Sequence, residues 1–213
     1  MTASIRRIPA ATLLRYWRLL AHYHGGVVNH AELARSLDVS ETTSRRYLDL
    51  LTGTFMVRQL QPWFANLGKR QVKSPKVYLR DSGLLHALLE LGDARALARH
   101  PKLGASWEGF ALEQALILTG NRDCYFWATH AAAELDLLIV RGDRRVGIEF
   151  KRADAPQMTR SLRIAIDDLK LETALIVYPG DRRYALAGGA VSVLPLSELE
   201  AELRRLRLVQ QGP

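Results

Sequence analysis

The sequence predicts an α/β (α+β) chain in two parts, with a boundary near residue 103. Apolar residues recur at helical spacing in the first part, whereas helices and short strands alternate in the second. A connector at 92–104, which contains glycines and Pro101, separates the two patterns. With 213 residues and 48% hydrophobic content, the chain can bury a core as one large or two small domains. The expected domains are therefore 1–103 and 104–213.

The first part contains a helix-turn-helix pattern. A helix is expected over 10–24, and two shorter helices follow over 30–37 and 41–52, the last one rich in Thr, Ser and Arg. A tight turn joins the two short helices, as in helix-turn-helix proteins. Strands over 55–60 and 76–79 then flank a basic loop. Together these elements predict an N-terminal winged helix.

The excess positive charge of the chain lies in this first part. Residues 1–105 contain 16 Lys and Arg against 7 Asp and Glu, whereas residues 106–213 contain 14 against 15. Such asymmetry favours DNA as a partner of the first part. The candidate DNA-binding residues are Thr42, Thr43, Arg45 and Arg46 for a groove, and Lys69, Arg70 and Lys73 for phosphates. Winged helices also dock proteins, and in that alternative these side chains are solvated surface.

The second part is expected to begin with a helix over 106–118 and to centre on a hairpin. Leu135–Val140 and Val146–Phe150 read as strands, and Gly142-Asp143 suits a tight turn. The predicted elements around them are strands over 125–128, 174–178, 184–186 and 191–193, and helices over 156–169 and 197–206. The expected N-caps in the whole chain are Asn29, Ser40, Ser106 and Ser197, the last with Glu200 as a capping box.

A two-residue loop fixes the register of the hairpin by counting. The expected cross-strand pairs are Arg141 with Arg144, Ile139 with Val146, Asp136 with Glu149, and Glu134 with Lys151. Two opposed carboxylates need a cation between them, or one of them must keep its proton.

The Asp136–Glu149 pair therefore predicts a Mg²⁺ site, with Mn²⁺ as a substitute metal. Lys151 follows Glu149 by two residues, so it is expected on the same strand face as a catalytic cation. Glu108 lies on an apolar flank of the preceding helix, where a carboxylate usually needs a partner. The alternative is a surface hairpin with solvated acids and a Glu134–Lys151 ion pair.

This order of residues and elements resembles the PD-(D/E)XK nuclease-like fold, also called restriction-endonuclease-like. An acid on the first helix, an Asp on the second strand, Glu-x-Lys on the third and a following helix–strand unit carry the resemblance. It implies that Asp136 and Glu149 hold the metal, that Lys151 supports catalysis, and that Glu108 is the first-helix acid.

A second resemblance covers nearly the whole chain. Asn-Leu-Gly-Lys-Arg-Gln-Val-Lys-Ser-Pro-Lys-Val-Tyr-Leu-Arg-Asp-Ser-Gly-Leu-Leu at 66–85, Gly-Ala-Ser-Trp-Glu-Gly-Phe at 104–110, Glu-Leu-Asp at 134–136 and Ile-Glu-Phe-Lys at 148–151 resemble bacterial and archaeal AAA-type ATP-binding proteins. The similar region is their C-terminal domain of unknown function, which implies a winged helix before a nuclease-like fold. The chain has no Gly-x-x-x-x-Gly-Lys-Ser/Thr loop, so we expect no ATP site in it. It is expected to be a truncated or split product, or to work with a separate ATPase.

Other classes of protein fit the sequence less well. A single cysteine, Cys124, excludes a disulfide framework and reads as buried core. The histidines lack ligand spacing, so zinc is not expected. The sequence shows neither a signal peptide nor a stretch of the roughly 20 apolar residues that a membrane span needs, which predicts a cytoplasmic protein without a membrane partner.

Two functional hypotheses follow. The first is a Mg²⁺-dependent deoxyribonuclease to which the winged helix delivers the duplex. The second is a catalytically silent nuclease-like scaffold that docks DNA or a partner ATPase. Convergence of Asp136, Glu149 and Lys151, with Glu108 in reach, is expected for the first hypothesis, and side chains that point apart for the second.

Overall fold

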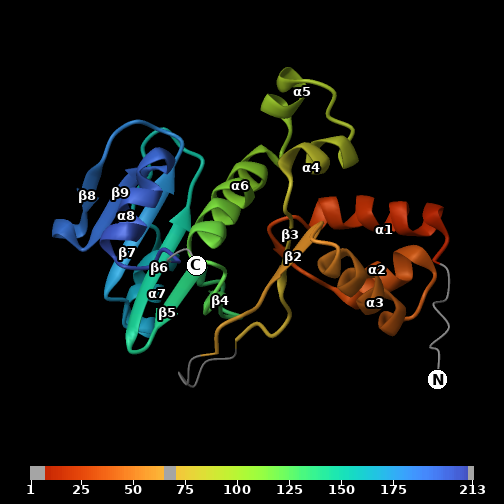
Figure 1. The fold of residues 1–213 in the computed structure, drawn as a ribbon, viewed down its shortest axis with the longest axis horizontal. Helices are drawn as coiled ribbons and strands as arrows, with labels where there is room; N and C mark the ends of the chain where they lie inside the picture. The colour runs from red at the N-terminus through yellow and green to blue at the C-terminus, as the bar shows by residue number, and fades with distance from the viewer. Residues whose placement is uncertain (1–7, 65–70, 211–213) are drawn as a thin grey trace.

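The computed structural model describes residues 8–64 and 71–210, which form a mixed α+β fold with two sheets (Figure 1). The first half combines helices with a three-stranded antiparallel sheet in the order β1-β3-β2. Its elements are α1 (Ala10–Tyr23), β1 (Gly26–Val27), α2 (His30–Leu37), α3 (Glu41–Gly53), β2 (Val57–Leu60), β3 (Lys76–Leu79), α4 (Ser82–Leu88) and α5 (Ala94–Arg99).

The core of the first half lies between α1, α2, α3, α4 and this sheet. Each of the three longer helices buries one apolar stripe, and β3, the central strand, is buried along its whole length. The shared core includes Tyr16, Leu20, Leu33, Leu48, Leu51, Val77 and Leu85. Helices α1, α2 and α3 and the two longer strands were predicted, whereas the two-residue β1 and the short α5 were not. Both are too short to produce a periodic pattern.

The second half contains a six-stranded mixed sheet in the order β4-β5-β6-β7-β9-β8. Pairing is parallel between β6, β7 and β9 and antiparallel elsewhere. One face of the sheet packs against α6 and α8, and the other packs against α7. The elements are α6 (Leu103–Leu118), β4 (Cys124–Ala128), β5 (Glu134–Arg141), β6 (Arg144–Phe150), α7 (Arg160–Leu169), β7 (Thr173–Tyr178), β8 (Tyr184–Leu186), β9 (Val191–Pro195) and α8 (Leu199–Arg205).

The two halves are joined through α6, which lies between the two sheets in Figure 1, and through residues 61–64 and 71–75 between β2 and β3, which we call the arm. Leu60 and Tyr78 of the small sheet share a core with residues of α6. Beyond the small sheet, the arm reaches β4, where the amides of Trp63 and Val72 donate to the carbonyl oxygens of Phe126 and Ala128 at 2.7 and 3.1 Å. These bonds cover the β4 edge, which would otherwise present unpaired backbone groups.

Two of the predicted N-caps are confirmed. The side chain of Asn29 accepts from the Glu32 amide, and that of Ser40 accepts from the Thr43 amide.

The caps predicted in the second half are wrong. Helix α6 begins three residues before Ser106, which lies inside the helix and contacts Nε2 of His86 at 2.8 Å. A 3₁₀ turn precedes α8, and Glu200 pairs with Arg204 instead of closing a capping box. Helix α7 starts at Arg160, not Pro156, with Thr159 as its cap.

In the ranges 8–64 and 71–210, no helix is both long enough and apolar enough to cross a membrane.

Candidate functional site

The β5–β6 hairpin has the predicted register. Arg141 pairs with Arg144 and Ile139 with Val146 across a turn in which Gly142 has a φ of 58°. Regular pairing ends at Leu137 and Ile148, one step before Asp136 and Glu149. There the Phe150 amide donates to Oδ2 of Asp136 at 3.1 Å, which holds the Asp136 carboxylate at the open end of the hairpin.

Four carboxylates gather at this end of the hairpin. We call Glu108, Glu134, Asp136 and Glu149 the acidic cluster. Three of them, Glu108 from α6 and Glu134 and Asp136 from β5, line one small cavity of about 80 Å³. Glu149 follows on β6, where the charge of Asp136 acts on it directly. The structure therefore brings together the acids that the sequence singled out.

Lys76 of the small sheet reaches into the acidic cluster, and the sequence analysis gave it no role. Its side chain is 3% exposed, forms an ion pair with Glu134 and places Nζ 3.5 Å from Oδ1 of Asp136. The ammonium also lies 5.5 Å from the centre of the Phe126 ring. Burial alone would lower the pKa of Lys76, but its negative neighbours reverse that effect and raise it. Lys76 is therefore a fixed positive charge in the cluster.

The carboxyl groups respond to burial and to one another. Burial, reinforced by the charge of Asp136, raises the pKa of Glu149 to about 9, and Lys151 opposes this shift. Burial also raises the pKa of Asp136, although the positive charge of Lys76 acts in the opposite direction. Burial is the main cause that raises the pKa of Glu108 as well. Oε2 of Glu149 is buried without a hydrogen-bond partner. Glu149 therefore keeps its proton near neutral pH.

Lys151 lies at the rim of the cluster and not on a strand face. Strand β6 ends at Phe150, and the Lys151 amide donates to the carbonyl oxygen of Val177 at 2.9 Å. Its side chain is exposed, and its charge lowers the pKa of both Glu108 and Glu149. The expected Glu134–Lys151 pair is replaced by the Glu134–Lys76 pair.

The acidic cluster is not arranged to hold Mg²⁺ or Mn²⁺. In the described part of the chain, no group of three His, Cys, Asp or Glu side chains is arranged to hold a metal ion. Lys76 contacts two of the four carboxylates, and the Phe150 amide occupies the second oxygen of Asp136. The side chains in this arrangement do not fit a divalent metal.

The candidate DNA-binding residues that the structure describes lie on α3 and on the segment 71–75, which precedes β3. Thr42, Arg45 and Arg46 are exposed on α3, whereas Thr43 is half-buried, with Oγ1 2.9 Å from Oγ of Ser40. Lys73 is exposed on the arm. The predicted contacts Lys69 and Arg70 lie outside the described residues.

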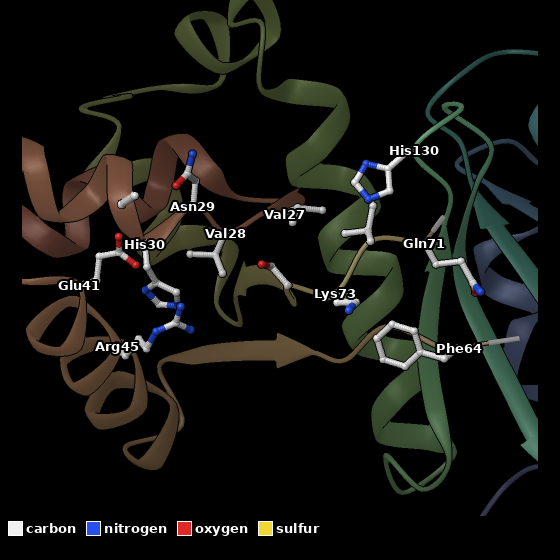
Figure 2. Close-up of a pocket in the computed structure, with 13 residues that line it drawn as sticks. Val27, Val28, Asn29, His30, Glu41, Arg45, Phe64, Gln71, Lys73 and His130 are labelled. Carbon is white, nitrogen blue, oxygen red and sulfur yellow. The ribbon is translucent and has the colours of Figure 1, made fainter. Parts of the chain in front are cut away.

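A cavity of about 850 Å³ opens beside these cations (Figure 2). Arg45 lines it from α3, Lys73 from the arm, and His130 from the β4–β5 loop of the other half. Within 8–64 and 71–210, neither Arg45 nor Lys73 forms an ion pair, and Glu41 is the acid in the lining. Burial lowers the pKa of His30, so that this lining residue is neutral. The cavity wall thus carries two unpaired cations, Arg45 from α3 and Lys73 from the arm.

The fold and site define a two-part chain, and comparisons with known proteins give the same division. Residues 2–95 match a family described as a domain of unknown function (DUF8612), and residues 103–199 match another domain of unknown function (DUF4143). The boundary between the two matches falls in the predicted connector.

Two curated mycobacterial proteins are similar to nearly the whole chain. The uncharacterized proteins Rv2008c of Mycobacterium tuberculosis and Mb2031c of Mycobacterium bovis are each 56% identical to it over 187 residues. The match covers 88% of this chain but 42% of each relative, so the chain spans less than half the length of these relatives. No solved structure matched the chain.

Proposed function

We propose that this chain is a DNA-docking module in which a winged helix binds duplex DNA and a nuclease-like domain serves as a scaffold. The observation that carries the proposal is the pair of unpaired cations that line the 850 Å³ cavity beside α3, Arg45 from α3 and Lys73 from the arm. The charge balance of +9 in residues 1–105 supports it, because phosphate contacts supply most of the affinity for DNA.

The winged-helix assignment is supported by the order of the elements. Helices α2 and α3 are joined by a three-residue turn at 38–40, and β2 and β3 form the following hairpin. Strand β1 adds to β3, as expected for a winged helix with a small three-stranded sheet. The exposed Thr42, Arg45 and Arg46 then lie on the helix that would enter a groove.

The nuclease-like assignment of the second half is supported by the placement of its acids. Asp136 and Glu149 lie at the open end of an antiparallel hairpin, and Glu108 faces Asp136 from α6. Parallel strands on both sides of α7 follow, as the resemblance implies. The buried ion pairs of Lys76 favour the silent scaffold over a working nuclease, because its ammonium already pairs with Glu134 and Asp136, the two carboxylates of β5.

Metal-dependent DNA cleavage is the second candidate function, and one observation favours it. Oε2 of Glu149 is a buried carboxyl oxygen without a partner, beside a second buried carboxyl group. Such an atom is satisfied by a proton or by a cation. In a nuclease, the exposed Lys151 at the rim would be a cation for a bound phosphate.

We also propose a separate ATPase as the protein partner of this chain. The proposed location is the cytoplasm. The chain lacks a phosphate-cradling loop, and its curated relatives are more than twice as long as the region that matches it. If the chain binds no DNA, the surface around the 850 Å³ cavity is instead assigned to docking of the ATPase.

The test is a measurement of DNA affinity against salt concentration by fluorescence anisotropy on a labelled duplex. The double variant Arg45→Ala/Arg46→Ala removes two cations from the helix that would enter the groove, so it should bind DNA more weakly and lower the salt slope by up to about two. The matched control is Arg95→Ala/Arg99→Ala on α5, which removes two exposed arginines away from the cavity. An equal loss in both double variants, or no DNA binding by the unaltered chain, contradicts the proposal. A plasmid-nicking assay with Mg²⁺ and Mn²⁺ distinguishes the scaffold from the nuclease.

A further inference from the structure

The cavity beside α3 is lined by both halves of the chain (Figure 2). Arg45 comes from α3, Phe64 and Lys73 come from the arm, and His130 comes from the β4–β5 loop. The volume of about 850 Å³ lies within the range of roughly 300–1,000 Å³ that is usual for pockets that hold small molecules. The cavity is therefore large enough for a group of the size of a nucleotide.

Phe64 gives this cavity an accessible aromatic face. The preceding residue, Trp63, packs against the ring of Tyr125 at 5.0 Å between centres, and its amide donates to the carbonyl oxygen of Phe126. The arm is thus attached to β4 directly before Phe64, whose side chain is 55% exposed. A single exposed aromatic ring needs no explanation by itself. This ring, however, lines a cavity that cations also line.

The charged residues in the lining favour an anionic ligand. Arg45 and Lys73 are the two cations, and Glu41 is the acid, one helical turn before Arg45 on α3. Among the described residues that line the cavity, positive charge is therefore in excess. Half-buried apolar side chains, among them Val27 and Val72, form other parts of the wall. The lining thus suits a ligand that combines a flat apolar surface with negative charge.

An unpaired nucleotide has both properties. Its phosphate groups are anionic, and its base offers a face on which an aromatic side chain can stack. In a continuous duplex the bases stack on one another, so a protein reaches the phosphates and the base edges in the grooves. Only a nucleotide outside the stack can place its base against Phe64.

We propose that the cavity holds an unpaired nucleotide of the docked DNA, with its base against Phe64 and its phosphates near Arg45 and Lys73. The preferred ligand is then a duplex that continues into a single strand. Helix α3 contacts the duplex part, and the cavity takes the first unpaired part. This inference rests on the proposed function, because it names the DNA structure that the same surface binds.

Fluorescence anisotropy on two labelled ligands tests this preference. One ligand is a blunt duplex, and the other is the same duplex with a single-stranded tail. The unaltered chain should bind the tailed duplex about tenfold more tightly, as expected for one base stacked on an aromatic ring. Phe64→Ala should abolish the difference between the two ligands, and Phe64→Trp should keep it.

The matched control is Phe55→Ala, which removes an exposed phenylalanine that lines a separate cavity with Ile117. This variant should keep the preference for the tailed duplex. Equal affinity of the unaltered chain for the two ligands overturns this inference and leaves the proposed function intact. Binding of neither ligand contradicts the proposed function, and this inference with it.

A second measurement uses the unaltered chain and locates the base directly. A tailed duplex with 5-iodouracil at the first unpaired position is irradiated in the complex, and the crosslinked peptide is identified by mass spectrometry. The crosslink should lie at Phe64, since the halogenated base reacts with an aromatic ring that it contacts. A crosslink formed only at residues outside the cavity overturns the inference.

Discussion

Gly109 of α6 and His24, at the end of α1, are packed so closely that a methyl group on Gly109 would come 2.3 Å from Nε2 of His24. His24 is 2% exposed, and its Nε2 donates to the carbonyl oxygen of Ala105 at 3.1 Å. Its Nδ1 accepts from the Leu79 amide at 3.0 Å. A neutral imidazole therefore joins α1, β3 and α6, and the residues 104–110 that carry a family resemblance lie at this junction.

We expect Gly109→Ala to destabilise the chain by about 1–3 kcal/mol, because the added methyl group must displace a buried ring. Urea unfolding followed by circular dichroism measures this change. Gly104→Ala on the same helix is the control, since nothing lies within 4 Å of the added carbon there. Gly104→Ala should be neutral or stabilise by up to about 1 kcal/mol. Equal changes in the free energy of unfolding for the two substitutions would show that the contact between Gly109 and His24 does not contribute to stability.

The contribution of His24 to the stability of the chain should fall as the pH drops from about 6.5 to 4. Burial lowers the pKa of His24 from 6.5 to about 4 in the folded state, so the unfolded chain takes up a proton first. The contribution is fully present above pH 6.5 and is lost towards pH 4, up to about 3 kcal/mol. His24→Gln should flatten the unfolding free energy in this window. His22→Gln, on the exposed side of the same helix, should keep the wild-type slope.

Glu113 of α6 also joins the two halves. Arg58 of β2 donates to it twice, at 2.6 and 2.8 Å, and Arg80 donates at 2.6 Å. Because the Glu113 side chain is 8% exposed, Glu113→Ala leaves two partly buried arginines without their anion and should cost about 3–5 kcal/mol. Glu200→Ala breaks an exposed helical pair with Arg204 and should cost about 0.5 kcal/mol or less. Thermal unfolding of both variants checks the contrast.

The register of the β5–β6 hairpin could be predicted because it is a local property. A two-residue turn fixes which residues face each other, so counting from Gly142 placed Asp136 near Glu149. The caps at Asn29 and Ser40 could be predicted for the same reason, since each bonds an amide three residues later. The spacing of residues along the chain determines short-range geometry of this kind.

The role of Lys76 could not be predicted from spacing. Its partner Glu134 lies 58 residues away, and the sequence Lys-Val-Tyr-Leu around it indicates a strand and no more. Ser106 was misassigned as a cap for a similar reason, because its hydroxyl contacts His86 of α4. Both errors come from docking between elements distant in sequence, which local patterns do not encode.

Glu149 should make the chain less stable as the pH rises. Its folded-state pKa is raised to about 9 by burial and by Asp136, whereas in the unfolded chain the carboxyl titrates near 4.5. Between these values the folded state holds a proton that the unfolded state has released, so unfolding becomes easier by about 1.4 kcal/mol for each pH unit.

The isosteric substitution Glu149→Gln keeps a hydrogen-bonding group and removes this proton linkage. Its stability should exceed that of the unaltered chain by an amount that grows from pH 5 to pH 8, measured by urea unfolding in matched buffers. Glu172→Gln, at a half-exposed ion pair with Arg144, should leave the pH profile unchanged. Parallel profiles for Glu149→Gln and the unaltered chain would mean that Glu149 is ionised in the folded state. The Asp136–Glu149 pair would then carry two negative charges beside the single ammonium of Lys76.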